Sequence, residues 1–209
     1  NEHKDYEYVL LHCPNGLFDL ADKLLIGNNA IRSDEAIRSF ELQMYKLYNK
    51  KFLVVCVTCG RNKTREKEIE SAMKMTDDKL ISLGYTDKFM KRRSKWSFSY
   101  RNIEYDLKTI IELKKWNNIV THNKDGEYGH MHHKMIHNMV YDIKPKHLSS
   151  FGKYYTKRKI QKLDPKVLEK YRLNEKTLKH KEQVLTRYKS QKKVKDMFSH
   201  MIPYENIDI

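Results

Sequence analysis

The chain has 209 residues, of which 39% are apolar, 33% charged and 11% aromatic, and its formal net charge is +15. This length predicts one domain with a buried core, and the aromatic content argues against a disordered chain. No apolar run approaches the roughly 20 residues of a membrane-spanning helix, so we expect no membrane span. Three cysteines, an odd number, argue against a disulfide framework, and we expect a cytoplasmic protein in a reducing compartment.

The first half of the chain alternates short apolar runs with an amphipathic stretch. Residues 6–13 and residues 23–27 are apolar runs closed by turn residues, and either predicts the first core strand. Residues 33–48 predict a helix with Ser33 as its N-cap. Residues 52–57 (FLVVCV) are continuously apolar, as a strand covered on both faces should be.

The alternation continues through the middle of the chain. Helices are predicted over residues 64–83 and 103–115, and a strand is predicted over residues 118–121. The basic, aromatic stretch 89–100 is interpreted as a loop that faces substrate. This order predicts an α/β fold, a single Rossmann-like domain with a mostly parallel sheet and helices on both faces.

Ligands of such a sheet bind beyond the carboxyl ends of its strands. We therefore expect residues 28–35, 58–65 and 123–133 to converge. Cys56 and Cys59 have CxxC spacing, but side chains three residues apart on a strand point to opposite faces. We interpret the two cysteines as structural, and a redox protein is the least favoured function.

The last quarter of the chain differs from the rest in charge. From Lys144 to Lys195 there are 18 Lys or Arg residues against four acids, a balance of +14, whereas the remainder carries +1. We expect one domain over residues 1–209, with a sheet-forming body (1–143) and a basic, mainly helical C-terminal extension (144–209) packed on it. Helices are predicted after residue 165 and over residues 174–197. Such a basic surface attracts nucleic acid or a phosphorylated ligand, or it is a solvated helical face.

Histidines are concentrated directly after the strand predicted at residues 118–121. Four of the ten histidines lie in residues 126–137 (GEYGHMHHKMIH). On a helix that begins near His130, the side chains of His130, His133 and His137 share one face. Neutral imidazole is the commonest side-chain ligand of zinc and similar metals. The pattern predicts a metal or catalytic site, and the alternative is a surface loop whose histidines bond to water or backbone.

Several short motifs have a recognisable order. They are Asp34-Glu35-Ala36, Thr58-Cys59-Gly60, Arg65-Glu66-Lys67-Glu68, Gly129-His130-Met131-His132-His133 and a late Ser190-Gln191. Their order and spacing resemble the PIG-L/LmbE-like zinc-dependent N-deacetylases. The resemblance implies a metal-dependent, most simply zinc-dependent, amide hydrolase. Such an enzyme removes the acetyl group of an N-acetylated sugar or sugar conjugate, as N-acetylglucosaminyl deacetylases do.

The resemblance also implies roles for individual residues. Asp34 and His133 would be metal ligands, and His130 would stabilise the tetrahedral intermediate or protonate the leaving amine. Arg65 and Asn29 would contact substrate. However, Ile31 and Ser33 stand where the family has a ligand histidine and a catalytic-base aspartate.

A third ligand and a base must therefore come from elsewhere if the chain is an active enzyme. The candidate third ligands are His132, His137, Asn29 and His12, and the candidate bases are Glu35 and Asp125. The alternative is a degenerate relative that binds a phosphorylated glycan, nucleotide sugar or nucleic acid without catalysis.

Overall fold

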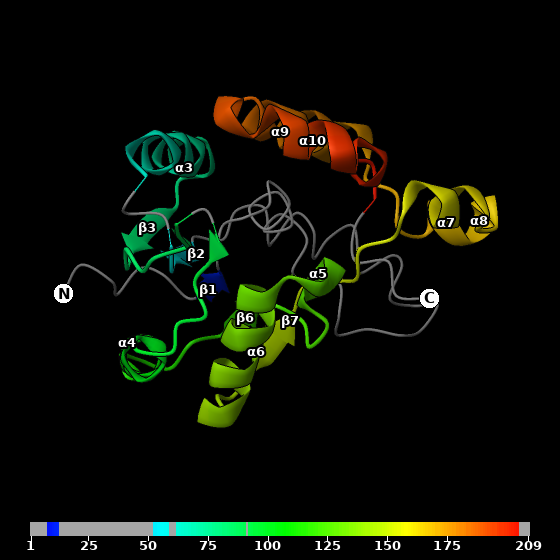
Figure 1. Cartoon of the computed structure of the whole chain (residues 1–209). Coiled ribbons are helices and arrows are strands. Elements are labelled where there is room, and N and C mark those ends of the chain that lie inside the picture. The colour runs from blue at the N-terminus through cyan, green and yellow to red at the C-terminus, as the bar shows by residue number, and fades with distance from the viewer. Residues whose placement is uncertain (1–7, 13–51, 59–61, 91, 205–209) are drawn as a thin grey trace.

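The computed structural model describes residues 8–12, 52–58, 62–90 and 92–204 (Figure 1). Its centre is a five-stranded sheet with the order β3-β2-β1-β6-β7. All neighbouring strands in this sheet run parallel. The strands are β1 (Tyr8–His12), β2 (Phe52–Cys56), β3 (Lys79–Ser82), β6 (Asn118–Thr121) and β7 (Leu148–Ser150).

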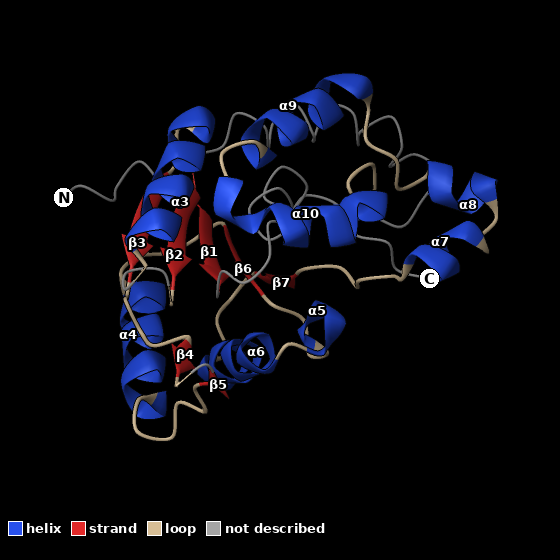
Figure 2. Cartoon of the chain, turned by 45° about the horizontal axis from the view of Figure 1, so that its top comes forward, coloured by secondary structure: helices blue, strands red, loops and turns tan. Residues whose placement is uncertain are grey.

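Helices cover both faces of this sheet, and a small antiparallel hairpin stands apart from it (Figure 2). The hairpin strands are β4 (Lys88–Phe89) and β5 (Arg92–Arg93). The helices are α3 (Lys63–Thr76), α4 (Tyr100–Glu112), α5 (Gly126–Gly129), α6 (Met131–Ile143), α7 (Lys157–Gln161), α8 (Pro165–Glu169), α9 (Glu175–Leu185) and α10 (Lys192–Phe198), with 3-10 turns η3 (Lys189–Gln191) and η4 (Ser199–Met201). The predicted α/β class with a mostly parallel sheet is confirmed.

Strand β2 shows why both faces must be covered. Its five side chains are fully buried, and they alternate between two cores because successive residues on a strand point to opposite faces. Phe52, Val54 and Cys56 pack in the core that contains residues of α3 and α9. Leu53 and Val55 pack in the core formed with α4 and α6. Full burial of such a side chain contributes roughly 1.5–3 kcal/mol, so the uninterrupted apolar run is the basis of the two-sided fold.

The helix predicted over residues 64–83 is confirmed as far as Thr76 and is wrong beyond it. Helix α3 ends at Thr76 because Asp77 adopts a left-handed conformation (φ 51°) whose N–H reaches the carbonyl of Met73. The next residue, Asp78, accepts a hydrogen bond from the N–H of Phe52 at 2.8 Å. That bond leads the chain into β3, which pairs with β2 where helix was predicted.

The C-terminal part is helical, as expected, but it also completes the sheet. Strand β7 lies beyond residue 143 and pairs with β6. The single helix predicted over residues 174–197 is two helices, α9 and α10, with η3 between them. Residues of α9 enter the same core as α3, and the role of this basic segment in ligand binding stays a prediction.

Several predicted features lie outside the described residues. They are the helix at 33–48, the run at 23–27, and the site candidates Asn29, Asp34 and Glu35. Cys59 also lies outside, so its relation to Cys56 stays a prediction. Among the residues that are described, no helix combines the length and apolarity that crossing a membrane requires.

Candidate metal centre

The site begins where strand β6 ends, with a loop that Asn123 organises. The Asn123 side-chain oxygen accepts hydrogen bonds from the N–H groups of Asp125 and Glu127, both at 3.0 Å. Its amide nitrogen donates to the carbonyls of Phe151 and Gly152, just after β7. A buried asparagine that uses both ends in this way fixes the loop to the neighbouring strand.

The loop turns sharply at Gly126 and Glu127. Gly126 has φ +61°, and a Cβ there would lie 3.0 Å from Cγ of Lys134 and 3.3 Å from Cβ of His133. Glu127 also has a positive φ, 57°, with ψ −66°. Such a conformation costs a side-chain-bearing residue on the order of 1–3 kcal/mol, and the surrounding structure must impose it.

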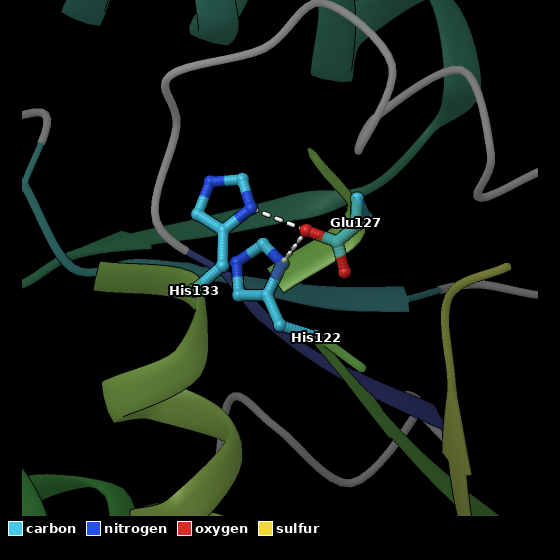
Figure 3. Close-up of side chains that lie close together, drawn as sticks. All are labelled: His122, Glu127 and His133. Atoms are coloured by element: carbon cyan, nitrogen blue, oxygen red, sulfur yellow. Dashed lines mark hydrogen bonds and ion pairs between the residues drawn. The ribbon is translucent and has the colours of Figure 1, made fainter. Parts of the chain in front are cut away.

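This turn aims the Glu127 carboxylate at two imidazoles (Figure 3). Its Oε2 accepts a hydrogen bond from Nδ1 of His122 at 3.1 Å and a shorter one from Nδ1 of His133. Its Oε1 accepts from the N–H of Asn123 at 2.9 Å. The two histidine side chains are fully buried, and their rings stack with centroids 3.7 Å apart.

The three side chains form a group that could hold a metal ion. One nitrogen from each histidine and one carboxylate oxygen lie within 4.8 Å of one another. Burial alone would raise the pKa of the Glu127 carboxyl. The charges of His122 and His133 and their hydrogen bonds outweigh burial and hold that pKa well below its usual range. Glu127 is therefore an anion at neutral pH.

His130 lies beside this group at the N-cap of α6. Its ring is buried, and its centroid is 4.2 Å from that of His133. Among the residues that are described, neither of its ring nitrogens has a hydrogen-bond partner. Burial, followed by the charges of His133 and Arg93, lowers the pKa of His130 to about 2, so the imidazole is neutral at neutral pH.

The other two histidines of the cluster, His132 and His137, each bond to a backbone carbonyl near the site. His137 Nδ1 is 2.8 Å from the carbonyl oxygen of His122, to which it donates. His132 donates from Nε2 to the Ser94 carbonyl at 2.6 Å and stacks flat on Trp96, with centroids 3.9 Å apart. Each bond commits one nitrogen of a proposed alternative ligand to a backbone carbonyl.

Arg65 lies at the edge of the same region, in the first turn of α3. Its guanidinium donates to the Gln191 side chain at 2.9 Å and lies 3.8 Å from Asp87. Asp87 also pairs with Arg93 at 2.9 Å and lies 3.5 Å from Nδ1 of His132. The regions predicted at residues 58–65 and 123–133 thus meet through Asp87, and the third region, 28–35, lies outside the described residues.

A second long-range contact joins two of the motifs found in the sequence. Glu68 accepts hydrogen bonds from the N–H of Ser190 at 2.6 Å and from its hydroxyl at 2.7 Å. Together with the Arg65–Gln191 bond, this contact fastens η3 to α3 across more than 120 residues of chain. The Arg-x-x-Glu and Ser-Gln motifs are therefore partners in this structure.

Three residues of the centre were not singled out from the sequence. Asn123 and Glu127 lie within the ligand-binding region expected at residues 123–133, which was the available signal. His122 lies one residue before that region, directly after β6. The mixture of polar types in this loop did not distinguish a ligand from a loop-stabilising residue. His133 and His130 were singled out, and the structure brings both to the same group.

Residues 33–144, more than half of the chain, match the family model of PIG-L, GlcNAc-PI de-N-acetylase. The chain belongs to the PIG-L family. The matched region contains β2, β6 and the whole His122–Glu127–His133 group. The resemblance seen in the sequence motifs is therefore confirmed.

A curated relative and two solved structures are also similar to this PIG-L chain. Uncharacterized protein L374 of Acanthamoeba polyphaga mimivirus is 30% identical over 102 residues, which are 48% of this chain. The chain spans 43% of the length of that relative. The N,N'-diacetylchitobiose deacetylase of Pyrococcus horikoshii, solved with its inhibitor MPG, has a TM-score of 0.51 at 17% identity, covering 96% of this chain and 77% of the other.

The second structure is GalB, the 4-carboxy-2-hydroxymuconate hydratase of Pseudomonas putida KT2440. Its TM-score is 0.50 at 10% identity, covering 94% of this chain and 84% of GalB. At these identities both structures show a shared fold only. The family assignment therefore rests on the family model, and the two structures add the shared fold.

Proposed function

We propose that this protein is a metal-dependent N-deacetylase that hydrolyses the acetamide of an N-acetylated sugar or sugar conjugate. The observation that carries the proposal is the buried His122–Glu127–His133 group. It lies inside the segment matched by the family model and beyond the carboxyl end of β6, where a parallel sheet binds its ligands.

Zinc fits this donor set best. Two imidazoles and one carboxylate are a common ligand combination of catalytic zinc, which keeps a further position for water or substrate. His122, Glu127 and His133 would hold the ion, and the anionic state of Glu127 offsets part of its charge. When bound, zinc would polarise the acetamide carbonyl and make water a stronger nucleophile at neutral pH.

Asp34 is proposed as a further ligand of the same ion, because the family resemblance implies that role. His133 is the ligand common to the resemblance and to the described group, which makes its variant the most informative. Glu35 is the proposed base that takes a proton from the attacking water. It would substitute for the base that Ser33 cannot supply, because an unactivated serine does not accept protons near pH 7.

His130 is proposed to act on the acetamide itself. Its two ring nitrogens are buried and without partners among the described residues, so neither is committed to another described group. A neutral imidazole N–H that donates to the carbonyl oxygen stabilises the negative charge as water adds to the carbon. The C–N bond then breaks as Glu35 passes the proton that it took from water to the sugar nitrogen, and acetate leaves.

Arg65 and Asn29 are proposed to contact the sugar. The guanidinium of Arg65 is held by Gln191 and faces Asp87, so its orientation is set before substrate binds. Such fixed donors suit the hydroxyl groups of a sugar because little side-chain freedom is lost on binding. An Arg65→Lys variant keeps the charge but loses the fork of donors, and its KM should rise more than its kcat falls.

Acetate release tests the proposal. Purified protein would be stripped of metal, reloaded with zinc, and incubated with N-acetylglucosamine conjugates. Zinc-dependent acetate release that falls at least about a hundredfold in His130→Ala supports the assignment, since general-acid, base and oxyanion groups typically contribute 10²–10⁴-fold. His147→Asn, on an exposed residue ahead of β7, is the matched control. Equal acetate release by wild type and His130→Ala would refute the role of His130.

A further inference from the structure

The hairpin β4–β5 and the residues after it carry an unusual surface. Phe89, Met90 and Phe98 have exposed fractions of 66%, 81% and 101%. The cations Lys88, Arg92 and Lys95 among them are also exposed, and the sequence has no acidic residue from 88 to 103. We call these six side chains the hairpin surface.

Several contacts fix the base of the hairpin to the rest of the domain, so the exposed apolar side chains stand on an anchored element. Trp96 is buried, and its indole N–H donates to the carbonyl of Thr86 at 2.9 Å. Arg93 pairs with Asp87 at 2.9 Å, and His132 of α6 bonds to the Ser94 carbonyl. The tight turn includes Met90 at φ +49°, and two large apolar side chains project from it.

Exposed phenylalanine and methionine do not stabilise this domain, because water surrounds them in the folded state. Apolar side chains ringed by cations suit the surface of an anionic bilayer, where rings and thioether enter the headgroup–acyl boundary and cations meet lipid phosphates. A nucleic acid would use the same cations, and Phe89 and Phe98 offer rings for base stacking. Met90, which is 81% exposed, has no such ring, and an acyl boundary accommodates all three apolar side chains.

We propose that the hairpin surface docks the protein on an anionic membrane surface. The docked face lies next to the candidate metal centre, because the hairpin strands lie beside α6, which carries His133 (Figure 2). Asp87 links Arg93 of the hairpin to His132, the neighbour of His133. Docking would hold the histidine cluster at the membrane, and it does not depend on the deacetylase activity.

Co-sedimentation with lipid vesicles tests this proposal with the full chain. Vesicles of phosphatidylcholine alone and of phosphatidylcholine with 30% phosphatidylserine, roughly the anionic fraction at which polybasic attraction is strong, separate apolar from electrostatic binding. We expect binding to the anionic vesicles that weakens as salt rises. A Phe89→Ser, Met90→Ser double variant should reduce the partition coefficient at least about tenfold, because two apolar side chains leave the boundary.

Two controls test whether vesicle binding depends on this surface rather than on any exposed apolar side chain or on the net positive charge of the chain. Tyr105→Ser and Leu113→Ser remove exposed apolar side chains of α4 and the residue after it, and vesicle binding should be unchanged. Lys192→Glu, Lys193→Glu reverses two charges of the basic C-terminal segment, and it should weaken binding less than Arg92→Glu, Lys95→Glu. Equal vesicle binding by wild type and the Phe89/Met90 variant would overturn the proposal. It would also be overturned if the protein bound a single-stranded oligonucleotide but did not bind vesicles. Thermal melts confirm that each variant is folded.

Discussion

Replacing Glu127 with glutamine removes one negative charge from the centre while keeping the side chain's shape. The carboxylate accepts hydrogen bonds from two imidazoles and from the N–H of Asn123. A glutamine has one acceptor oxygen, and its other terminal atom is a donor. While both imidazoles donate from Nδ1, at least one of these three donors would therefore face another donor in the Glu127→Gln protein.

The size of the effect follows from this geometry. A hydrogen bond to a charged group contributes about 1.5–3 kcal/mol, and the side chain of Glu127 is only 9% exposed, so solvent screens it little. We expect the metal-free variant to lose about 1.5–3 kcal/mol of unfolding free energy. For a chain of this length that loss lowers Tm by about 3–12 °C.

The loss should also depend on pH, with a defined sign. The pKa of Glu127 is lowered in the folded protein, so its stabilising contribution is present above the unfolded value near 4.5. That contribution disappears as pH falls through the folded pKa. The difference in stability between wild type and Glu127→Gln should therefore be full at pH 7 and should shrink below about pH 4.5.

Thermal unfolding in EDTA at pH 7 and below about pH 4.5, followed by circular dichroism, measures both effects. A further melt in zinc at pH 7 measures the response to metal. Zinc should raise the Tm of wild type much more than that of the variant, because a lost ligand or orienting carboxylate reduces affinity at least about 10–100-fold. Glu169→Gln is the control, since Glu169 is 73% exposed and pairs with Arg172 on the surface. If Glu127→Gln matched wild type in both Tm and zinc response, the carboxylate would have no role in the centre.

Three further substitutions test separate contacts. Gly126→Ala should lower bound zinc, measured by plasma mass spectrometry, because the new Cβ presses on His133; Gly129→Ala, at φ +91° with open space, should retain it. The pKa of Tyr85 is raised to about 12 by burial and its bond to Asp106, so its stabilising contribution is full below pH 10 and lost as pH rises through 12. The Tm difference between wild type and Tyr85→Phe should thus shrink from pH 8 to pH 11.5, and a constant difference would contradict this reasoning. Ser190→Ala should lower the unfolding free energy by about 1–3 kcal/mol, because it loses the hydroxyl bond to the Glu68 carboxylate. Ser199→Ala loses only an exposed bond to a backbone carbonyl and should lower it less; equal urea midpoints for the two variants would refute this reasoning.

The elements predicted well are those whose signal is local. The run at residues 52–57 is apolar at every position, and it forms β2 between two cores. The helix carrying the histidines begins at Met131, beside the expected start at His130, and its apolar face is buried. In both cases burial of a periodic apolar pattern decides the conformation, and that pattern is visible in the sequence.

The elements predicted poorly depend on partners far along the chain. Leu80 continues the helical spacing of Met73 and Thr76, yet it lies in β3 because Asp78 and β2 redirect the chain. Strand β7 has one apolar residue in three, Leu148, and exists through its pairing with β6. No local pattern distinguishes these segments from a helix end or a loop.

The residues of the candidate site show the same difference between local and long-range signals. His130 and His133 were predicted because their spacing on one helix is readable in the sequence. Glu127 was not, because its role depends on a positive φ that aims the carboxylate inward, and a glutamate in a glycine-flanked loop is ordinarily exposed. The hydrogen bond between His132 and the Ser94 carbonyl joins residues 38 positions apart, so it could be predicted only from the tertiary structure.

The most direct test is the zinc stoichiometry of wild type, His133→Ala and His147→Asn, measured by equilibrium dialysis at pH 7. His133 belongs to the described donor group and is also the ligand that the family resemblance implies. The centre predicts about one tightly bound zinc per chain in wild type and His147→Asn, and at least about a tenfold weaker affinity in His133→Ala. Equal zinc binding by all three proteins would contradict a metal centre at His133.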